Sequence, residues 1–265
     1  MKLIENDIQE LLAEKLAVNI YNTREEMGAD AAKRVSAKIQ ELQNTQEFVN
    51  IIFASAPSQN EFLDALATDT AISWERIRAF HMDEYIGLPG DAPQSFGHFL
   101  KVRLFDKVPV HAVYYLNGNN SETDAECEHY AHLLMEYPTD IVCMGIGENG
   151  HLAFNDPHVA FFDDPQTVKV VALDIPCRQQ QVNDGCFGSF GQVPETAFTL
   201  TIPTLMSSKF VFCMVPGINK AQAIQHTIEA PVQEVYPSTI LRTHPQAILF
   251  IDRASAGKLQ GISSL

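Results

Sequence analysis

Seven apolar runs recur along the chain and are separated by stretches in which apolar positions have a helical spacing. The apolar runs occupy residues 49–55, 77–82, 112–118, 140–147, 167–173, 209–217 and 247–252. They are mostly continuous rather than alternating, which is typical of strands covered on both faces. The helical stretches occupy residues 7–44, with a break expected near Gly28, and 60–68, 94–105, 121–136, 174–183 and 218–228. This alternation predicts a doubly wound α/β fold: a mostly parallel sheet flanked by helices in a Rossmann-like three-layer sandwich.

The chain shows no internal repeat and no long Pro/Gly/Ser linker, so the sequence predicts one domain over residues 1–265, with a helical segment at 1–45 packed on it. The formal charge of −15, from 33 acids against 18 bases, disfavours nucleic acid and anionic membranes as partners. The N-terminal residues do not have the pattern of a signal peptide, and no run reaches the ~18 to 20 apolar residues of a membrane span. We therefore expect a cytoplasmic protein.

The cysteines also exclude some functions. The five cysteines contain no Cys-x-x-Cys pair, and Cys143 and Cys213 lie within apolar runs. We interpret them as buried free thiols rather than as a disulfide framework or a zinc site, because the spacing of zinc ligands is missing.

Candidate chemistry follows the run 140–147, because ligands of doubly wound folds bind beyond the carboxyl ends of the strands. The segment "MGIGENGHLAFNDP" begins there. Gly147 and Gly150 permit close backbone approach and positive φ, and the turn can aim His151 into the crevice. Asp156 is a carboxylate that can fix the tautomer of this imidazole and raise its basicity. By composition alone, a tight turn with a surface histidine fits equally well.

A second polar segment, with Asp83 and Glu84, directly follows the run 77–82. Two adjacent acids at this place are more often a solvated turn or a helix cap. A carboxylate held in a partly apolar crevice would have a raised pKa, which suits a general base.

Two further segments could bind an anion. Small residues precede a helix that begins near Asn60, and backbone N–H groups and hydroxyls at such a helix start can face a negative charge. The candidates in this loop are Ser55, Ala56, Ser58 and Gln59. Lys220, after the run 209–217, can neutralise a phosphate. Taken alone, a simple helix cap and a solvated lysine are the more common readings. The absence of a Walker motif disfavours a nucleoside triphosphate.

Together these segments resemble the glucosamine-6-phosphate deaminase family, which is related to 6-phosphogluconolactonases. The resemblance extends from about residue 48 to 252 through "HMDEYIGLP", "SFGHFL", "YLNGNNSETDAEC", "MGIGENGHLAFNDP", "QVPETAFTLTIPTLM", "GINKAQA" and "ILRTHPQAI". It implies isomerisation of a 2-amino-2-deoxyhexose 6-phosphate with loss of ammonia, giving fructose 6-phosphate, and with neither a metal nor an organic cofactor. The partner implied is a small sugar phosphate; the epimer and a homo-oligomeric assembly stay open.

The resemblance also assigns roles to individual residues. Asp83 matches the base that moves a proton between C2 and C1, and His151 matches the residue that assists ring opening. Asp156 stands where the family normally has a glutamate that supports this histidine, and Lys220 matches the phosphate-binding lysine.

The chain departs from the family pattern in three places. Asn149 stands where the family usually has an acid. The loop "ASAPSQ" contains neither the glycine nor the threonine usual in the family's phosphate loop. A phosphate-binding arginine is expected between 178 and 190, where Arg178 is the nearest candidate; Gln179, Gln180 and Asn183 could replace it by neutral hydrogen bonds.

Two alternatives stay open at this point. A 6-phosphogluconolactonase would use His151 but would have no need of Asp83. A catalytically weakened sugar-phosphate sensor fits the loss of the acid at Asn149, although no helix-turn-helix or basic region accompanies it.

Overall fold

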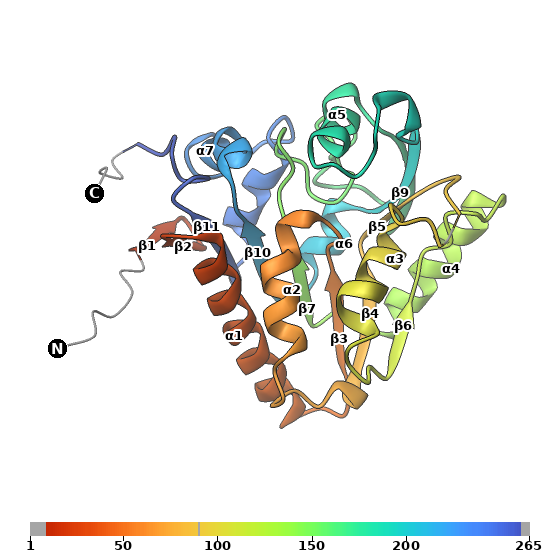
Figure 1. Ribbon diagram of the computed structural model, residues 1–265, viewed down its shortest axis with the longest axis horizontal. Coiled ribbons are helices and arrows are strands. Elements are labelled where there is room, and N and C mark those ends of the chain that lie inside the picture. The colour runs from red at the N-terminus through yellow and green to blue at the C-terminus, as the bar shows by residue number, and fades with distance from the viewer. Residues whose placement is uncertain (1–8, 90, 261–265) are drawn as a thin grey trace.

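The computed structural model describes residues 9–89 and 91–260 and contains an eight-stranded sheet (Figure 1). Its strands, in spatial order, are β1 (Gln9–Ala13), β2 (Leu16–Tyr21), β11 (Ala247–Asp252), β10 (Phe210–Val215), β7 (Ile141–Met144), β3 (Val49–Phe53), β4 (Ile77–His81) and β6 (Ala112–Tyr114). All neighbouring pairs are parallel except β1 with β2. The sheet confirms the predicted doubly wound, mostly parallel architecture.

Helices cover both faces of this sheet. The longer ones are α1 (Arg24–Gln43), α2 (Asn60–Ala67), α4 (Thr123–Glu136), α5 (Ile175–Asn183) and α7 (Ala221–Glu229); α3 (Phe96–Leu100) and α6 (Ile202–Met206) are short. Buried side chains of α1, α2 and α3 form one apolar cluster with Val49, Ile51 and Phe53. Those of α4, α6 and α7 form another with Ile52. Because successive strand residues point to opposite faces, β3 contributes to both clusters and separates the two helical layers.

Shorter helical turns complete several connections. They are η1 (Pro57–Gln59), η2 (Trp74–Arg76), η4 (Phe190–Gln192), η5 (Ile218–Lys220) and η6 (Pro237–Thr243), together with one π-helical turn, η3 (Lys101–Phe105). The stretch 94–105, expected as one helix, is therefore α3 followed by η3. Within the part of the chain that the structure describes, no helix is long and apolar enough to cross a membrane.

The N-terminal prediction was wrong in part. Residues 9–13 and 16–21, expected as helix, are the strands β1 and β2, whereas residues 1–8 lie outside the described part. The helix begins only at Arg24, where the Thr23 side chain accepts a hydrogen bond from the Glu26 N–H. Gly28 does not break α1; a Cβ there would lie 2.6 Å from the Glu61 Cβ, so glycine allows α1 and α2 to pack closely. Pairing of β2 with β11 explains the error, because tertiary contacts override local helix pattern.

A second, antiparallel sheet lies beside the first. It contains β5 (Asp83–Tyr85), β9 (Thr196–Leu200) and β8 (Val168–Ala172), in that order. The run 167–173 therefore forms a strand, as predicted, but outside the parallel sheet, and two of the five β8 residues are exposed. The strands β5 and β9 were not predicted.

The chain reverses its direction of winding between β3 and β7. From β3 it proceeds outward to β4 and β6, and from β7 it proceeds the other way to β10 and β11. Ligands of such sheets bind at this switch point, beyond the carboxyl ends of the strands. The residues after Phe53, His81, Met144 and Val215 are therefore brought to one crevice.

Candidate active site

A cavity lies at this switch point, and its lining contains most of the residues predicted from the sequence. Those residues are Ser55, Ala56, Ser58, Gln59, Asp83, Gly147, His151 and Lys220. Asn149, Gly150 and Asp156 belong to the same loop as His151 but do not line the cavity. Glu84 and Arg178 lie elsewhere.

The loop after β7 holds the imidazole of His151 against its own backbone. A Cβ at Gly147 would lie 2.2 Å from the His151 Nε2, so only glycine leaves room for the ring. Gly150 adopts φ +87°, a conformation that glycine adopts without strain, and its N–H donates to the Gly147 carbonyl at 3.0 Å. The glycines of this segment therefore serve to place one side chain at the cavity wall.

Asp156 supports His151 from behind. The His151 Nδ1 lies 3.0 Å from the Asp156 Oδ1, and the Asp156 side chain is fully buried. Burial alone would raise the pKa of Asp156, but the contacts with His151, the Asn149 amide and the Asp174 N–H hold it below its usual value. Asp156 is thus an ionised group that orients the ring of His151.

Asn149 connects both partners of this pair. Its Nδ2 donates to the Asp156 Oδ1 at 2.9 Å, and its Oδ1 accepts from the backbone N–H of His151 at 3.1 Å. An aspartate at this position would place a second carboxylate against Asp156 and could not donate. Asparagine in place of the expected acid therefore suits Asp156, because it donates a hydrogen bond to the Asp156 carboxylate. Asn149 does not line the cavity but positions the His151–Asp156 pair.

Asp83 faces the cavity from β5, where its backbone pairs with Thr199. It is buried, and desolvation, with a smaller contribution from the neighbouring Glu84 carboxylate, raises its pKa well above the usual value. A carboxylate with a raised pKa is a stronger base than an ordinary carboxylate, which suits a general base.

Glu84 does not line this cavity, contrary to the expectation that it lies with Asp83 in the site. Side chains alternate along β5, so Glu84 points away from Asp83. Its carboxylate accepts hydrogen bonds from the backbone N–H groups of Tyr85, Phe96 and Gly97 and from the Ser95 hydroxyl. Glu84 therefore anchors the start of α3 to β5, a role similar to the helix cap that the sequence offered as an alternative.

The cavity lining also contains groups that suit an anion. The Ser55 hydroxyl is buried and has no hydrogen-bond partner among the described residues, and the 54–59 loop leads into η1 and α2. Lys220 is buried too; burial lowers its pKa, against the opposing effect of Asp184 and Glu148. Lys220 forms none of the ion pairs found among the described residues. Its ammonium is available to a ligand.

Arg178 does not line the cavity, contrary to the prediction. Its Nη2 donates to the Val193 carbonyl at 2.8 Å and to the Phe190 carbonyl at 3.3 Å, and its guanidinium lies over the Phe190 ring. Arg178 therefore anchors the segment that follows α5. No other arginine lines the cavity among the described residues, so Lys220 is the one basic side chain there apart from His151.

The three neutral residues predicted as substitutes for an arginine, Gln179, Gln180 and Asn183, do not all face the cavity. Gln180 lines the cavity, and its Oε1 accepts from the Glu148 N–H at 2.8 Å. Gln179 and Asn183 bond to each other on the exposed face of α5. Gln181 and Asp184 line the cavity and were missed. Their spacing from Gln180 puts all three on one helical face, which a helical projection from the Asp174 cap could have revealed.

Two aromatic residues that were also missed, Phe96 and Phe154, line the cavity beside Asp83. Their rings stack with centroids 5.5 Å apart, and both contact the Tyr85 ring. They provide the apolar surroundings that desolvate Asp83.

Known proteins share both the sequence and this architecture. Residues 22–250 match the family model described as glucosamine-6-phosphate isomerases/6-phosphogluconolactonase. The chain belongs to this family. Its relatives include the glucosamine-6-phosphate deaminases of Lactobacillus helveticus, 32% identical over 83% of this chain and 88% of the relative, and of Listeria innocua, 32% identical over 86% and 96%.

Solved structures of the family agree. A structure described as a monomeric glucosamine-6-phosphate deaminase superposes with a TM-score of 0.83 at 29% identity, covering 91% of this chain and 98% of that one. The 6-phosphogluconolactonase of Thermotoga maritima gives a TM-score of 0.73 at 18% identity, covering 89% of this chain and 98% of that one. The second likeness concerns the fold alone.

Proposed function

We propose that this member of the family converts glucosamine 6-phosphate and water into fructose 6-phosphate and ammonia. The observation that carries the proposal is that Asp83, with its raised pKa, lines the same cavity as the oriented His151. The relatives that are 32% identical are named as deaminases, which supports this reaction over lactone hydrolysis and over sugar-phosphate sensing.

The substrate phosphate binds at the 54–59 loop and Lys220 in this proposal. Backbone N–H groups at a helix start and a buried ammonium both favour a phosphate dianion. This contact fixes the sugar so that its reacting carbons extend toward Asp83 and His151. Binding energy from the non-reacting phosphate then serves to orient the substrate.

His151 transfers a proton to the ring oxygen, and the ring opens to an aldehyde at C1. Asp83 then removes the C2 proton and returns it at C1, which leaves an imine at C2. Water adds to this imine, and ammonia leaves as the C2 ketone of fructose 6-phosphate forms. Ring opening breaks the bond between C1 and the ring oxygen, and deamination forms a C2–O bond with water and breaks the C2–N bond. The part proposed for Asp83 and His151 is to move the protons that these steps require.

The test measures ammonia release over a panel of sugar 6-phosphates: glucosamine, galactosamine and mannosamine 6-phosphate, with glucose 6-phosphate as the substrate without an amine. We expect release from glucosamine 6-phosphate and loss of this release in Asp83→Asn. Hydrolysis of 6-phosphogluconolactone without ammonia release from any amino sugar would overturn the proposal.

The same proposal includes a cytoplasmic enzyme that needs no nucleic-acid or membrane partner. A homo-oligomer was compatible with the sequence, whereas one solved relative is described as monomeric. We favour a monomer for this chain. A mass measured by light scattering during gel filtration tests this choice, and a mass of two or more chains would contradict it.

A further inference from the structure

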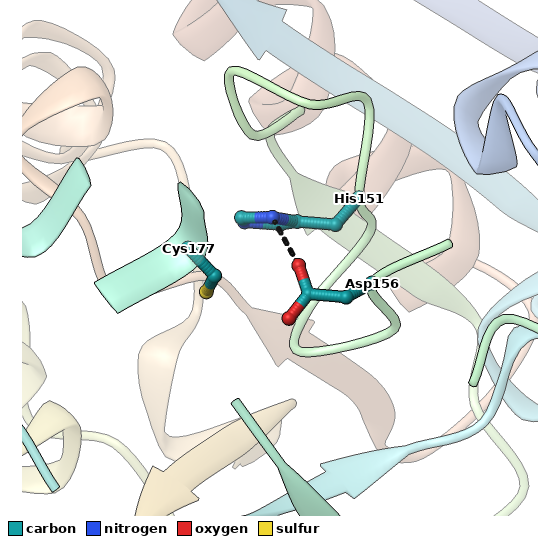
Figure 2. A group of neighbouring side chains, drawn as sticks. All are labelled: His151, Asp156 and Cys177. Atoms are coloured by element: carbon teal, nitrogen blue, oxygen red, sulfur yellow. Dashed lines mark ion pairs between the residues drawn. The ribbon is translucent and has the colours of Figure 1, made fainter. Parts of the chain in front are cut away.

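A thiol lies beside the His151–Asp156 pair and takes no part in the proposed reaction. Ligand atoms of His151, Asp156 and Cys177 all lie within 4.8 Å of one another (Figure 2). His151 and Asp156 come from the loop after β7, and Cys177 comes from the first turn of α5. All three side chains are buried, with Asp156 0% and Cys177 1% exposed.

The surroundings of these three residues are negatively charged. The Asp174 backbone N–H donates to the Asp156 Oδ2 at 3.4 Å, so two aspartates lie beside the thiol. The Asp174 carboxylate in turn accepts from the Cys177 N–H at 2.7 Å and from the Asn149 amide at 3.4 Å. One buried and one half-buried carboxyl group therefore lie beside the imidazole of His151 and the thiol of Cys177, and this arrangement favours a cation at this place.

We propose that His151, Asp156 and Cys177 form an inhibitory binding site for a thiophilic divalent cation of the Zn²⁺ class. A nitrogen, an oxygen and a sulfur ligand are the set that Zn²⁺ accepts, with water in the fourth position. Metal–ligand distances of about 2.0 to 2.3 Å in a tetrahedron place the ligand atoms ~3.4 to 3.6 Å apart. The His151 Nδ1 and Asp156 Oδ1, now 3.0 Å apart, need to separate only slightly.

A neighbouring group of ligating residues is less suited to this role. Asp156, His158 and Asp174 also lie within ligand distance of one another. His158, however, is exposed, and its Nε2 lies 3.2 Å from the Ala172 carbonyl oxygen. Both carboxylate oxygens of Asp174 already accept hydrogen bonds, and this group contains no thiol. The cation therefore selects the group that contains Cys177.

Binding of the cation would release the Cys177 thiol proton to solvent. The proton that the His151 Nδ1 holds toward Asp156 would move to Nε2, and the Nδ1 lone pair would then bind the cation. The carboxylate that orients this imidazole would then bind the cation instead. The inhibitory consequence rests on the proposed function, because it requires His151 to move a proton during ring opening. Binding itself does not depend on any reaction.

The first experiment measures binding on the full chain without substrate. Calorimetry with Zn²⁺ is expected to show one site, and Co²⁺ is expected to give the absorption of a tetrahedral cobalt–thiolate centre. Cys177→Ala should weaken the Zn²⁺ affinity of this site by more than ~100-fold, beyond the 10 to 100-fold that loss of an outer partner costs. Cys186→Ala, which removes a half-buried thiol just after α5, should bind as the parent does.

The second experiment measures ammonia release with and without Zn²⁺. Inhibition that a chelator reverses is expected in the parent and in Cys186→Ala, and resistance is expected in Cys177→Ala. Cys177→Ser, which keeps the side-chain shape, repeats the test if the alanine variant folds poorly. Equal Zn²⁺ affinity in the parent and both Cys177 variants would overturn the proposal. Zn²⁺ binding at Cys177 without ammonia release from any amino sugar would support the site and contradict the proposed function.

Discussion

The two ends of the cavity are built in different ways. At the catalytic end, where Asp83 and His151 line the cavity and where we propose that the reaction takes place, the His151 imidazole is held from behind by Asp156 and Asn149. At the phosphate end, formed by the 54–59 loop, Lys220 and the cavity face of α5, the Ser55 hydroxyl has no partner in the described part of the chain. The protein therefore holds the His151 side chain in place before any ligand binds, whereas the phosphate end keeps polar groups available for its ligand.

The largest expected effect tests the catalytic end. Asp83→Asn keeps the size of the side chain and removes its basicity, so kcat should fall by at least ~10²-fold while KM changes little. Steady-state ammonia release measures both constants. Hydrogen exchange between solvent and C2 of the substrate, followed by NMR, should stop as well. Exchange that continues in this variant would place the base on another residue.

The next effect tests the phosphate end. Lys220→Ala removes the basic side chain closest to the expected phosphate, and a charge-assisted hydrogen bond contributes about 1.5 to 3 kcal/mol. KM for the sugar phosphate should therefore rise by roughly 10 to 100-fold, with a smaller change in kcat. Inorganic phosphate should inhibit the parent competitively and the variant only weakly.

Arg178→Lys is the matched control for this prediction. The guanidinium of Arg178 binds the carbonyls of Phe190 and Val193, so its replacement should leave KM within a few-fold of the parent. A rise in KM as large as that of Lys220→Ala would show that Arg178 moves into the cavity when the phosphate binds.

The two ends also differ in how far sequence reasoning could describe them. The position of the site followed from the strand pattern, because parallel strands bring their carboxyl ends to one edge. Asp83, His151 and Lys220 follow such strands along the chain, and all three line the cavity at this edge, whereas their roles stay predictions. Arg178 and Gln181 lie only three residues apart on one helix, yet only Gln181 lines the cavity. The direction in which each side chain points depends on where α5 begins. The helix begins after Asp174, whose side chain caps it, and the sequence alone does not show that Asp174 rather than a neighbouring residue is this cap.

The remaining errors also come from contacts that a local pattern does not contain. The segment 9–21 became strands because β2 pairs with β11, more than 220 residues later in the chain. The sequence predicts Asp83 and Glu84 as neighbouring members of the site, but pairing with β9 makes Asp83–Tyr85 a strand, in which the two side chains point to opposite sides. In both cases a distant strand decided which way a side chain faces.

A smaller effect concerns the acidic limb of the pH–rate profile. Burial raises the pKa of Asp83, and the Glu84 carboxylate raises it further. A base must be ionised in the free enzyme, so kcat/KM should fall as pH decreases through this raised pKa. Glu84→Gln removes the neighbouring charge and should move the acidic limb to lower pH. An unchanged limb, in a variant whose melting temperature shows an intact fold, would mean that burial alone sets the pKa of Asp83.

The smallest expected effect is on stability, and its sign is opposite to that on activity. A carboxyl group whose pKa is higher in the folded than in the unfolded protein binds more protons when folded. Its contribution to the free energy of unfolding therefore declines as pH rises from about 4, the unfolded pKa, through the folded value.

Asp83→Asn removes the free-energy cost of holding a charge in an apolar cavity wall, so this variant should melt at a higher temperature than the parent. The difference should grow between pH 5 and pH 8, by about 2 to 4 °C for each kcal/mol gained. Melting curves of both proteins across this range measure it, and a variant that is less stable at pH 8 than the parent would show that the Asp83 carboxylate is stabilised by its surroundings. A higher melting temperature in Asp83→Asn would mean instead that the parent retains a carboxylate that lowers its stability because the reaction requires it.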